Sequence, residues 1–134
     1  MDDALKPGQT GTARLTVGEE HTAPRIGSGR IRVLGTPVMI NLMEAAALDA
    51  AERFLAAGHQ SLGTHLAVSH IAATPVGLTV TATAVLTEVR GNRLFFNVSA
   101  HDGIDTIGEG THERVVVDVA RFDARAARKA SPLG

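Results

Sequence analysis

The chain has 134 residues, of which 44% are hydrophobic and 20% charged, proportions typical of one soluble globular domain. Lys and Arg number 13 and Asp and Glu 14, giving a formal charge of -1, which argues against a nucleic-acid-binding module because such modules carry a basic surplus. Cysteine is absent, so disulfides, thiolate metal sites and cysteine nucleophiles are excluded.

Neither an export signal nor a membrane span is predicted. Residues 1–11, MDDALKPGQTG, are acidic and lack the apolar run of a signal peptide. The longest apolar-rich stretch contains Asn41, Glu44 and Asp49, which argues against a membrane-spanning helix. We therefore expect a cytoplasmic protein that binds neither membranes nor nucleic acid. It should form a single domain over residues 1–134, with residues 1–7 and 124–134 as flexible tails.

The N-terminal part of the chain predicts a strand, a loop and one long helix. Residues 9–17 alternate loosely between polar and apolar side chains and favour a strand. The following TAPRIGSGRIRVLGT is rich in Gly, Pro and Arg and indicates a mobile loop. Thr36 and Pro37 then provide an N-cap and a first helical residue. Gly58 provides a stop for the intervening segment, which is rich in Ala, Leu, Met and Glu.

Beyond residue 60 the pattern changes to strands joined by tight turns. A strand within residues 61–77 would set His70 on one face together with four apolar residues, Leu62, Leu66, Val68 and Ala72. Further strands are indicated over residues 78–86, 93–101 and 111–122, with turn signals at residues 90–92 and 101–103. Consecutive strands with short turns pair antiparallel, and one helix can cover their apolar face. We therefore predict an α+β fold, an antiparallel β-sheet wrapped around one long central α-helix.

Glu44 is expected on the packed face of this helix, where a charge needs an explanation. On a helical wheel it lies apart from the polar group, which consists of Asn41, Asp49, Glu52 and Arg53. Its predicted neighbours are apolar: Ile40, Leu48, Ala51 and Leu55. A carboxylate among them is costly unless it is hydrogen-bonded, protonated or held for use.

Thr36, Glu44 and His70 each have an ordinary explanation when they are taken one at a time. Thr36 is a helix cap, Glu44 a border residue that reaches water, and His70 a satisfied core or interface histidine. Taken together, a carboxylate and an imidazole on the inner faces of adjoining elements resemble an acid–base pair. Thr36 lies at the helix start, where free amides and the helix dipole favour developing negative charge.

Three segments of the chain resemble the fluoroacetyl-CoA thioesterase family of the hotdog-fold superfamily. They are GTPVMINLME, SLGTHLAVSHIAATPVGLTVTA and VSAHDGIDTIGEGTHERVVV, and the resemblance extends over about residues 35–122 with matching intervals. It implies a hotdog fold in which the sheet encloses the helix. It also implies a homodimer, or a dimer of dimers, with acyl-CoA sites at the interface between subunits.

The resemblance also implies roles for particular residues. The catalytic residues that it implies are Thr36, Glu44 and His70. The backbone N–H of Gly63 is implied to donate to the thioester oxygen. Arg114, in the string GTHER, is a candidate contact to the CoA phosphates, with an ordinary surface ion pair to Glu113 as the alternative.

The implied reaction is hydrolysis of an acyl-CoA to the carboxylic acid and CoA. Glu44 would act as nucleophile or as general base on water, which stays open, while His70 would transfer protons. No cofactor is expected, since CoA is part of the substrate. No metal is expected either, because the 6 His show no HxH or HxxxH spacing.

The acyl group is expected to be small or medium in size. Residues 25–35, RIGSGRIRVLG, contain no aromatic side chain, so we predict an open pocket without a strong preference for fluoroacetyl. Two other functions stay open: a non-catalytic acyl-CoA-binding hotdog domain, and a hotdog enoyl-CoA hydratase that would also use a histidine and a carboxylate.

Overall fold

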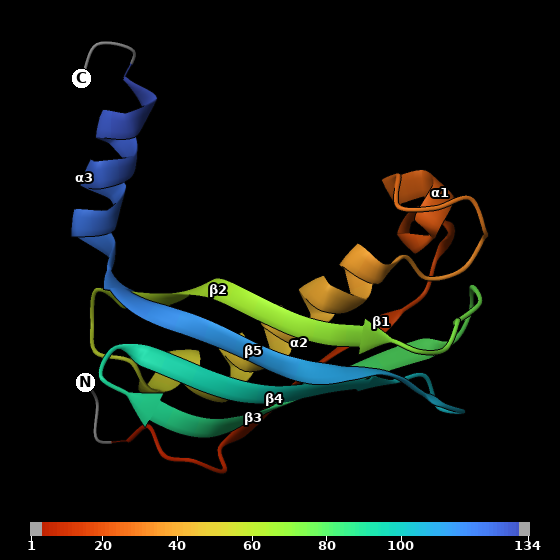
Figure 1. The fold of residues 1–134 in the computed structure, drawn as a ribbon, viewed down its shortest axis with the longest axis horizontal. Coiled ribbons are helices and arrows are strands. Elements are labelled where there is room, and N and C mark those ends of the chain that lie inside the picture. Colours follow the sequence, from red (N-terminus) through yellow and green to blue (C-terminus); the bar gives the residue numbers. More distant parts are fainter. Residues whose placement is uncertain (1–3, 132–134) are drawn as a thin grey trace.

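The computed structural model describes residues 4–131 and consists of one antiparallel sheet that curls around a long helix (Figure 1). The strands are β1 (Thr10–Thr16), β2 (His59–His70), β3 (Thr79–Arg90), β4 (Arg93–His101) and β5 (Thr106–Asp118). The α-helices are α1 (Ala23–Ile26), α2 (Thr36–Ala51) and α3 (Val119–Ala130), and two 3-10 turns span Glu19–His21 and Glu52–Phe54. The strand order is β1-β3-β4-β5-β2, with antiparallel neighbours throughout. The predicted α+β arrangement is confirmed.

The core lies between α2 and the inner face of the sheet. Inward residues of β3 and β4 alternate as predicted, and the buried members are Val80, Ala82, Ala84, Leu86, Leu94, Phe96, Val98 and Ala100. The buried face of α2 is built from small and flexible side chains, Met39, Met43, Ala46, Ala47 and Ala50. These side chains let the sheet come close, since a Cβ at Gly11 of β1 would collide with the α2 backbone at Ala46 and Ala50.

The last predicted strand begins and ends earlier than expected, and a helix follows it. β5 ends at Asp118, whose carboxylate accepts a hydrogen bond of 3.0 Å from the Arg121 N–H and so caps α3. The Ala, Arg and Lys of the next residues favour a helix, so residues 124–130 of the expected tail belong to α3. Residues 1–3 and 132–134 lie outside the described residues. Within residues 4–131, no helix is long and apolar enough to cross a membrane.

A β-bulge in β2 changes which side chains face the helix. The pairing of β2 with β5 shifts between Gly63 and His65, and one extra residue there reverses the two-residue alternation. Leu62 consequently points to the outer face and is 38% exposed, so its predicted place beside Leu66 and His70 is wrong. The same bulge leaves Gly63 on the inner face, next to α2.

Candidate active site

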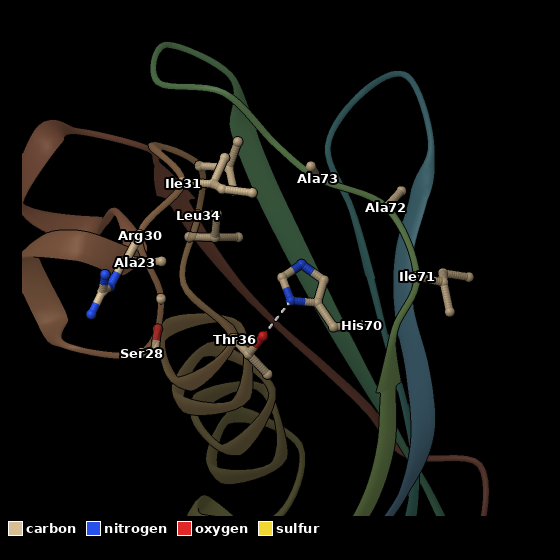
Figure 2. A pocket seen from close by; sticks show the side chains of 12 residues that line it. Ala23, Ser28, Arg30, Ile31, Leu34, Thr36, His70, Ile71, Ala72 and Ala73 are labelled. Atoms are coloured by element: carbon tan, nitrogen blue, oxygen red, sulfur yellow. Dashed lines mark hydrogen bonds between the residues drawn. The ribbon is translucent and has the colours of Figure 1, made fainter.

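Thr36 and His70 meet where the start of α2 approaches the end of β2 (Figure 2). The Thr36 Oγ1 lies 2.7 Å from the His70 Nδ1. The predicted capping role of Thr36 is wrong, because Gly35 is the N-cap and Thr36 is the first helical residue. Its hydroxyl makes no cap hydrogen bond, which leaves it available to hold the imidazole in one orientation.

The His70 ring is partly buried, and one of its nitrogens has no hydrogen-bond partner within residues 4–131. Burial lowers the pKa of the His70 imidazole, and the backbone of Ala72 offsets this only in part. The Nε2 atom is buried and makes no hydrogen bond within residues 4–131. Leaving a buried polar atom unpaired costs about 1–3 kcal/mol, which a purely structural histidine would avoid. The ring therefore offers a vacant proton-transfer position at Nε2.

A cavity of about 380 Å³ opens beside this pair. Much of its wall is apolar and comes from the segment before α2 and the loop after β2, including Val33, Leu34, Ala72 and Ala73. Arg30 lines the rim and turns its guanidinium away from the imidazole (Figure 2). None of the 12 lining residues is Phe, Tyr or Trp. The cavity suits a small apolar group placed within reach of His70.

Glu44 belongs to a second group of polar residues, on the flank of α2 beside β2 and β5. Its Oε2 lies 3.3 Å from Arg114 Nη1 and 4.0 Å from His112 Nε2. The face around Glu44 was expected to be packed, but its side chain is 35% exposed and its predicted neighbour Leu48 is exposed as well. Glu44 is therefore a border residue whose charge is matched by Arg114 and whose carboxylate stays accessible.

Gly63 lies directly against this carboxylate. A Cβ built at Gly63 would collide with Glu44 Oε2 and would lie 3.2 Å from His112 Cε1. Only glycine lets the carboxylate approach the strand backbone this closely. The bulge in β2 thus brings a carboxylate and strand backbone together at one spot.

Arg114 pairs with Glu44 and is almost fully buried, at 5% exposure. Its Nε donates to Ser61 Oγ at 2.8 Å and its Nη2 donates to Ser61 O at 3.0 Å. Arg114 was expected to contact the CoA phosphates or to form a surface ion pair with Glu113. Its guanidinium is instead buried rather than presented to solvent, and Glu113 pairs with Arg93 at 3.7 Å. With its planar donors fixed on Ser61, Arg114 positions the Glu44 carboxylate.

His112 was missed by the reasoning from sequence, although it completes this second group. It is fully buried, its Nδ1 lies 2.8 Å from the His65 carbonyl, and its Nε2 lies 3.1 Å from Arg114 Nη1. A carbonyl only accepts and a guanidinium only donates, so Nδ1 carries the proton and Nε2 accepts. Burial lowers the pKa of His112, which agrees with a neutral ring. Its alternation with Arg114 on the inner face of β5 was the available signal.

In one copy of the chain these two groups lie far apart. Thr36 and Glu44 are eight positions apart, about 12 Å along the helix axis. Gly63 and His70 are seven positions apart, roughly 20 Å along β2. An acid, a base and the atoms on which they act must lie within hydrogen-bond reach. A single copy therefore holds the candidate residues in two separate groups, one with Thr36 and His70 and the other with Glu44 and Gly63.

Asp102 is connected to the cavity wall through hydrogen bonds of Thr74. Its buried carboxylate accepts hydrogen bonds from Thr74 Oγ1 at 2.9 Å, Ile104 N at 3.0 Å and Asp105 N at 2.8 Å. The Thr74 carbonyl in turn accepts a hydrogen bond of 2.8 Å from Leu34 N. Burial alone would raise the pKa of Asp102, but the hydrogen bonds from Asp105, Ile104 and Thr74 together lower it.

Asp102→Asn is expected to destabilise the fold by about 1–3 kcal/mol at pH 7, the usual scale for weakening a buried charged hydrogen-bond group. A carboxyl group whose pKa is lower in the folded than in the unfolded protein stabilises the fold at pH values above its unfolded pKa. That stabilisation is lost as the pH falls through the folded pKa. The gap in melting temperature between wild type and variant should therefore narrow between pH 7 and pH 3. Asp105→Asn, an exposed neighbour, is the control; an equal gap at both pH values would contradict the assignment.

Known proteins that resemble this chain include thioesterases. The family model for fluoroacetyl-CoA-specific thioesterases matches residues 17–120. The fluoroacetyl-CoA thioesterase of Streptantibioticus cattleyicolor is 51% identical over 102 residues, which make up 76% of this chain and 73% of that protein.

Solved structures agree with the predicted hotdog fold. The structure of the fluoroacetyl-CoA thioesterase FlK matches with a TM-score of 0.89 at 41% identity, covering 97% of this chain and 100% of that one. A thioesterase superfamily member from Thermus thermophilus matches with a TM-score of 0.84 at 25% identity, covering 94% and 93%. A hot-dog-like protein from Thermanaerovibrio acidaminovorans, at 23% identity and a TM-score of 0.85 over 95% and 94%, shares the fold.

Proposed function

The chain belongs to the fluoroacetyl-CoA-specific thioesterase family, and we propose that it hydrolyses a small or medium acyl-CoA by means of Thr36, Glu44 and His70. The observation that carries the proposal is the buried, unpartnered Nε2 of His70 beside an apolar cavity. A domain that only binds acyl-CoA would have no use for that vacant nitrogen. The hydratase alternative is not favoured, because the family is one of thioesterases.

Two copies of the chain would complete the site by pairing through β2. This strand has 12 residues and lies at the edge of the sheet, so one side of its backbone has no strand partner within residues 4–131. Two exposed apolar residues lie on this strand or directly after it, Leu62 and Ile71. A long exposed edge with apolar neighbours is what a sheet normally covers, and a second copy related by a two-fold axis would cover it.

The alternation of inward and outward side chains along β2 favours one position for the two-fold axis of this pairing. A two-fold axis at Val68 keeps the inward residues Leu66, Val68 and His70 opposite inward residues of the second copy. It would bring His70 within about two residues of the second copy's bulge at Gly63, and hence near its Glu44. Each site would then take Thr36 and His70 from one copy and Glu44 and Gly63 from the other.

The chemistry follows from these roles. Water or the Glu44 carboxylate adds to the thioester carbonyl, and the Gly63 N–H would stabilise the resulting oxyanion. The C–S bond then breaks. When water attacks, the proton that it loses to Glu44 would be passed through the neutral His70 ring, whose orientation Thr36 fixes, to the departing CoA sulfur; when Glu44 attacks, CoA would leave as the thiolate. Attack by Glu44 itself gives an anhydride that water hydrolyses in a second step, whereas attack by water gives the acid directly.

A panel of short acyl-CoAs mixed with purified protein and a thiol reagent tests the proposal. Release of free CoA is the expected result. Loss of enoyl absorbance from a crotonyl-CoA sample, without thiol release, would show a hydratase. Saturable binding with neither signal would show a binding domain.

Light scattering at micromolar protein concentration is expected to give a dimer, or a dimer of dimers. Val68→Arg should shift the protein to monomers and remove most activity, because at a two-fold axis the introduced cation meets its own copy. Thr12→Arg adds the same charge on the opposite edge strand and is the control. A wild-type monomer with full activity would contradict the pairing through β2.

The acyl specificity should be broad. No Phe, Tyr or Trp lines the cavity. One small substituent in an open apolar pocket changes the free energy of transition-state binding by about 1–3 kcal/mol. We therefore expect fluoroacetyl-CoA to be preferred over acetyl-CoA by less than about a hundredfold, measured as the ratio of kcat/KM values. A preference on the order of a thousandfold, about 4 kcal/mol, would mean that another element discriminates the two groups.

A further inference from the structure

Helix α3 carries a basic face that has no acidic partner among residues 4–131. Its four cations, Arg121, Arg125, Arg128 and Lys129, fall within about 100° of one another on a helical wheel, whereas the opposite side is mostly alanine. No residue of α3 is buried, and none of the four cations forms an ion pair within residues 4–131. Figure 1 shows α3 standing away from the sheet at the end of β5. Such a concentrated charge favours a multiply anionic ligand.

A cleft of about 300 Å³ lies along this face. Arg121, Arg125 and Phe122 line it from α3, Asn92 lines it from the turn between β3 and β4, and Val116, Val117 and Asp118 line it from β5. Phe122 is 42% exposed, and the Asp118 carboxylate is engaged in capping the helix. Two guanidinium groups, an aromatic ring and a side-chain amide are the groups that recognise phosphates and a nucleobase.

The cleft lies at the end of β5, the strand that carries His112 and Arg114 next to Glu44. Arg114 and Asp118 are four residues apart on β5, roughly 13 Å at the rise of an extended strand. The Val119 N–H donates to the Gly58 carbonyl at 2.9 Å, which ties the start of α3 to the start of β2. The extended pantetheine arm of an acyl-CoA, which separates the thioester from the pyrophosphate, has a comparable length.

We propose that the basic face of α3 binds the phosphates of CoA, with Arg121 and Arg125 on the phosphate oxygens and Phe122 against the adenine. The assignment rests on the proposed acyl-CoA hydrolysis for its ligand. Binding at the nucleotide is shared by substrate and transition state, so it lowers KM without changing kcat. The nucleotide would anchor the substrate while the thioester reaches the catalytic groups.

The test compares acetyl-CoA with acetyl-pantetheine, which lacks the nucleotide. For the double variant Arg121→Gln, Arg125→Gln we expect KM for acetyl-CoA to rise at least about tenfold at constant kcat, because two charged contacts are lost. Both constants for acetyl-pantetheine should stay at their wild-type values. The double variant Arg14→Gln, Arg90→Gln removes the same charge from exposed positions on β1 and β3 and is the control.

Other outcomes overturn the assignment. An unchanged KM for acetyl-CoA, or a rise matched by the control, would show that α3 does not bind the nucleotide. An equal rise with acetyl-pantetheine would show that α3 acts on the assembly or the fold. If the wild type hydrolyses neither substrate, the proposed function fails, and calorimetric titration with free CoA decides the inference separately. CoA binding that the double variant loses supports it, and absence of binding to the wild type overturns it.

Discussion

Glu44→Gln and His70→Ala are each expected to lower kcat by about a hundredfold or more, the usual scale for removing a positioned acid or base. In the proposed mechanism the Glu44 carboxylate activates or replaces water, and the His70 Nε2, which has no hydrogen-bond partner within residues 4–131, lies beside the cavity. Gln keeps the shape of Glu44 and an oxygen that accepts from Arg114, so the fold should survive. Measurement of kcat with an acyl-CoA that the wild type hydrolyses checks both variants.

The double variant distinguishes one acid–base unit from two independent contributions. Residues that act as a unit are not additive, so Glu44→Gln with His70→Ala should lower kcat about as much as either change alone. Melting temperatures recorded alongside give the control. A loss of stability without a loss of rate would make His70 a structural histidine, and additive losses would remove the coupling.

Gly63→Ala is expected to lower kcat about as severely. The added methyl would collide with Glu44 Oε2, and displacement of a catalytic group by about 1 Å costs on the order of a hundredfold. Gly63 has no positive φ, so alanine brings no backbone strain and the fold should remain.

Shortening the carboxylate provides the control for Gly63. In Gly63→Ala with Glu44→Asp the shorter side chain leaves room for the methyl group. The double variant should therefore be less impaired than the product of the two single effects. Wild-type kcat for Gly63→Ala would contradict the close approach of Glu44 to the strand.

Sequence reasoning worked where one local rule decides the outcome. The alternation in β3 and β4 follows burial on one face, and the helix from Thr36 follows its composition and its Thr-Pro start. The roles of Thr36, Glu44, His70 and Gly63 came from the family resemblance, and the structure puts His70 beside Thr36 and Glu44 beside Gly63.

Features that depend on tertiary contacts were not predictable in this way. The bulge at Gly63 has no local sequence signal, because it exists only in the pairing of β2 with β5, and it reversed the expected face of Leu62. Arg114 looked like a surface cation in a strand, whereas burial against Ser61 and Glu44 makes it a positioning residue. The separation of Glu44 from His70 could be seen only when β2 and α2 were placed in space.

Heterodimers formed from one His70→Ala copy and one Glu44→Gln copy, purified by two different tags, test the central claim most directly. If each site takes His70 from one copy and Glu44 from the other, one of the two sites in such a heterodimer carries both changes and the other carries none. Acyl-CoA hydrolysis should then return to about half the wild-type rate per dimer, although each parent variant is nearly inactive. A heterodimer as inactive as its parents would contradict the account, since it would place Glu44 and His70 in the same copy's site.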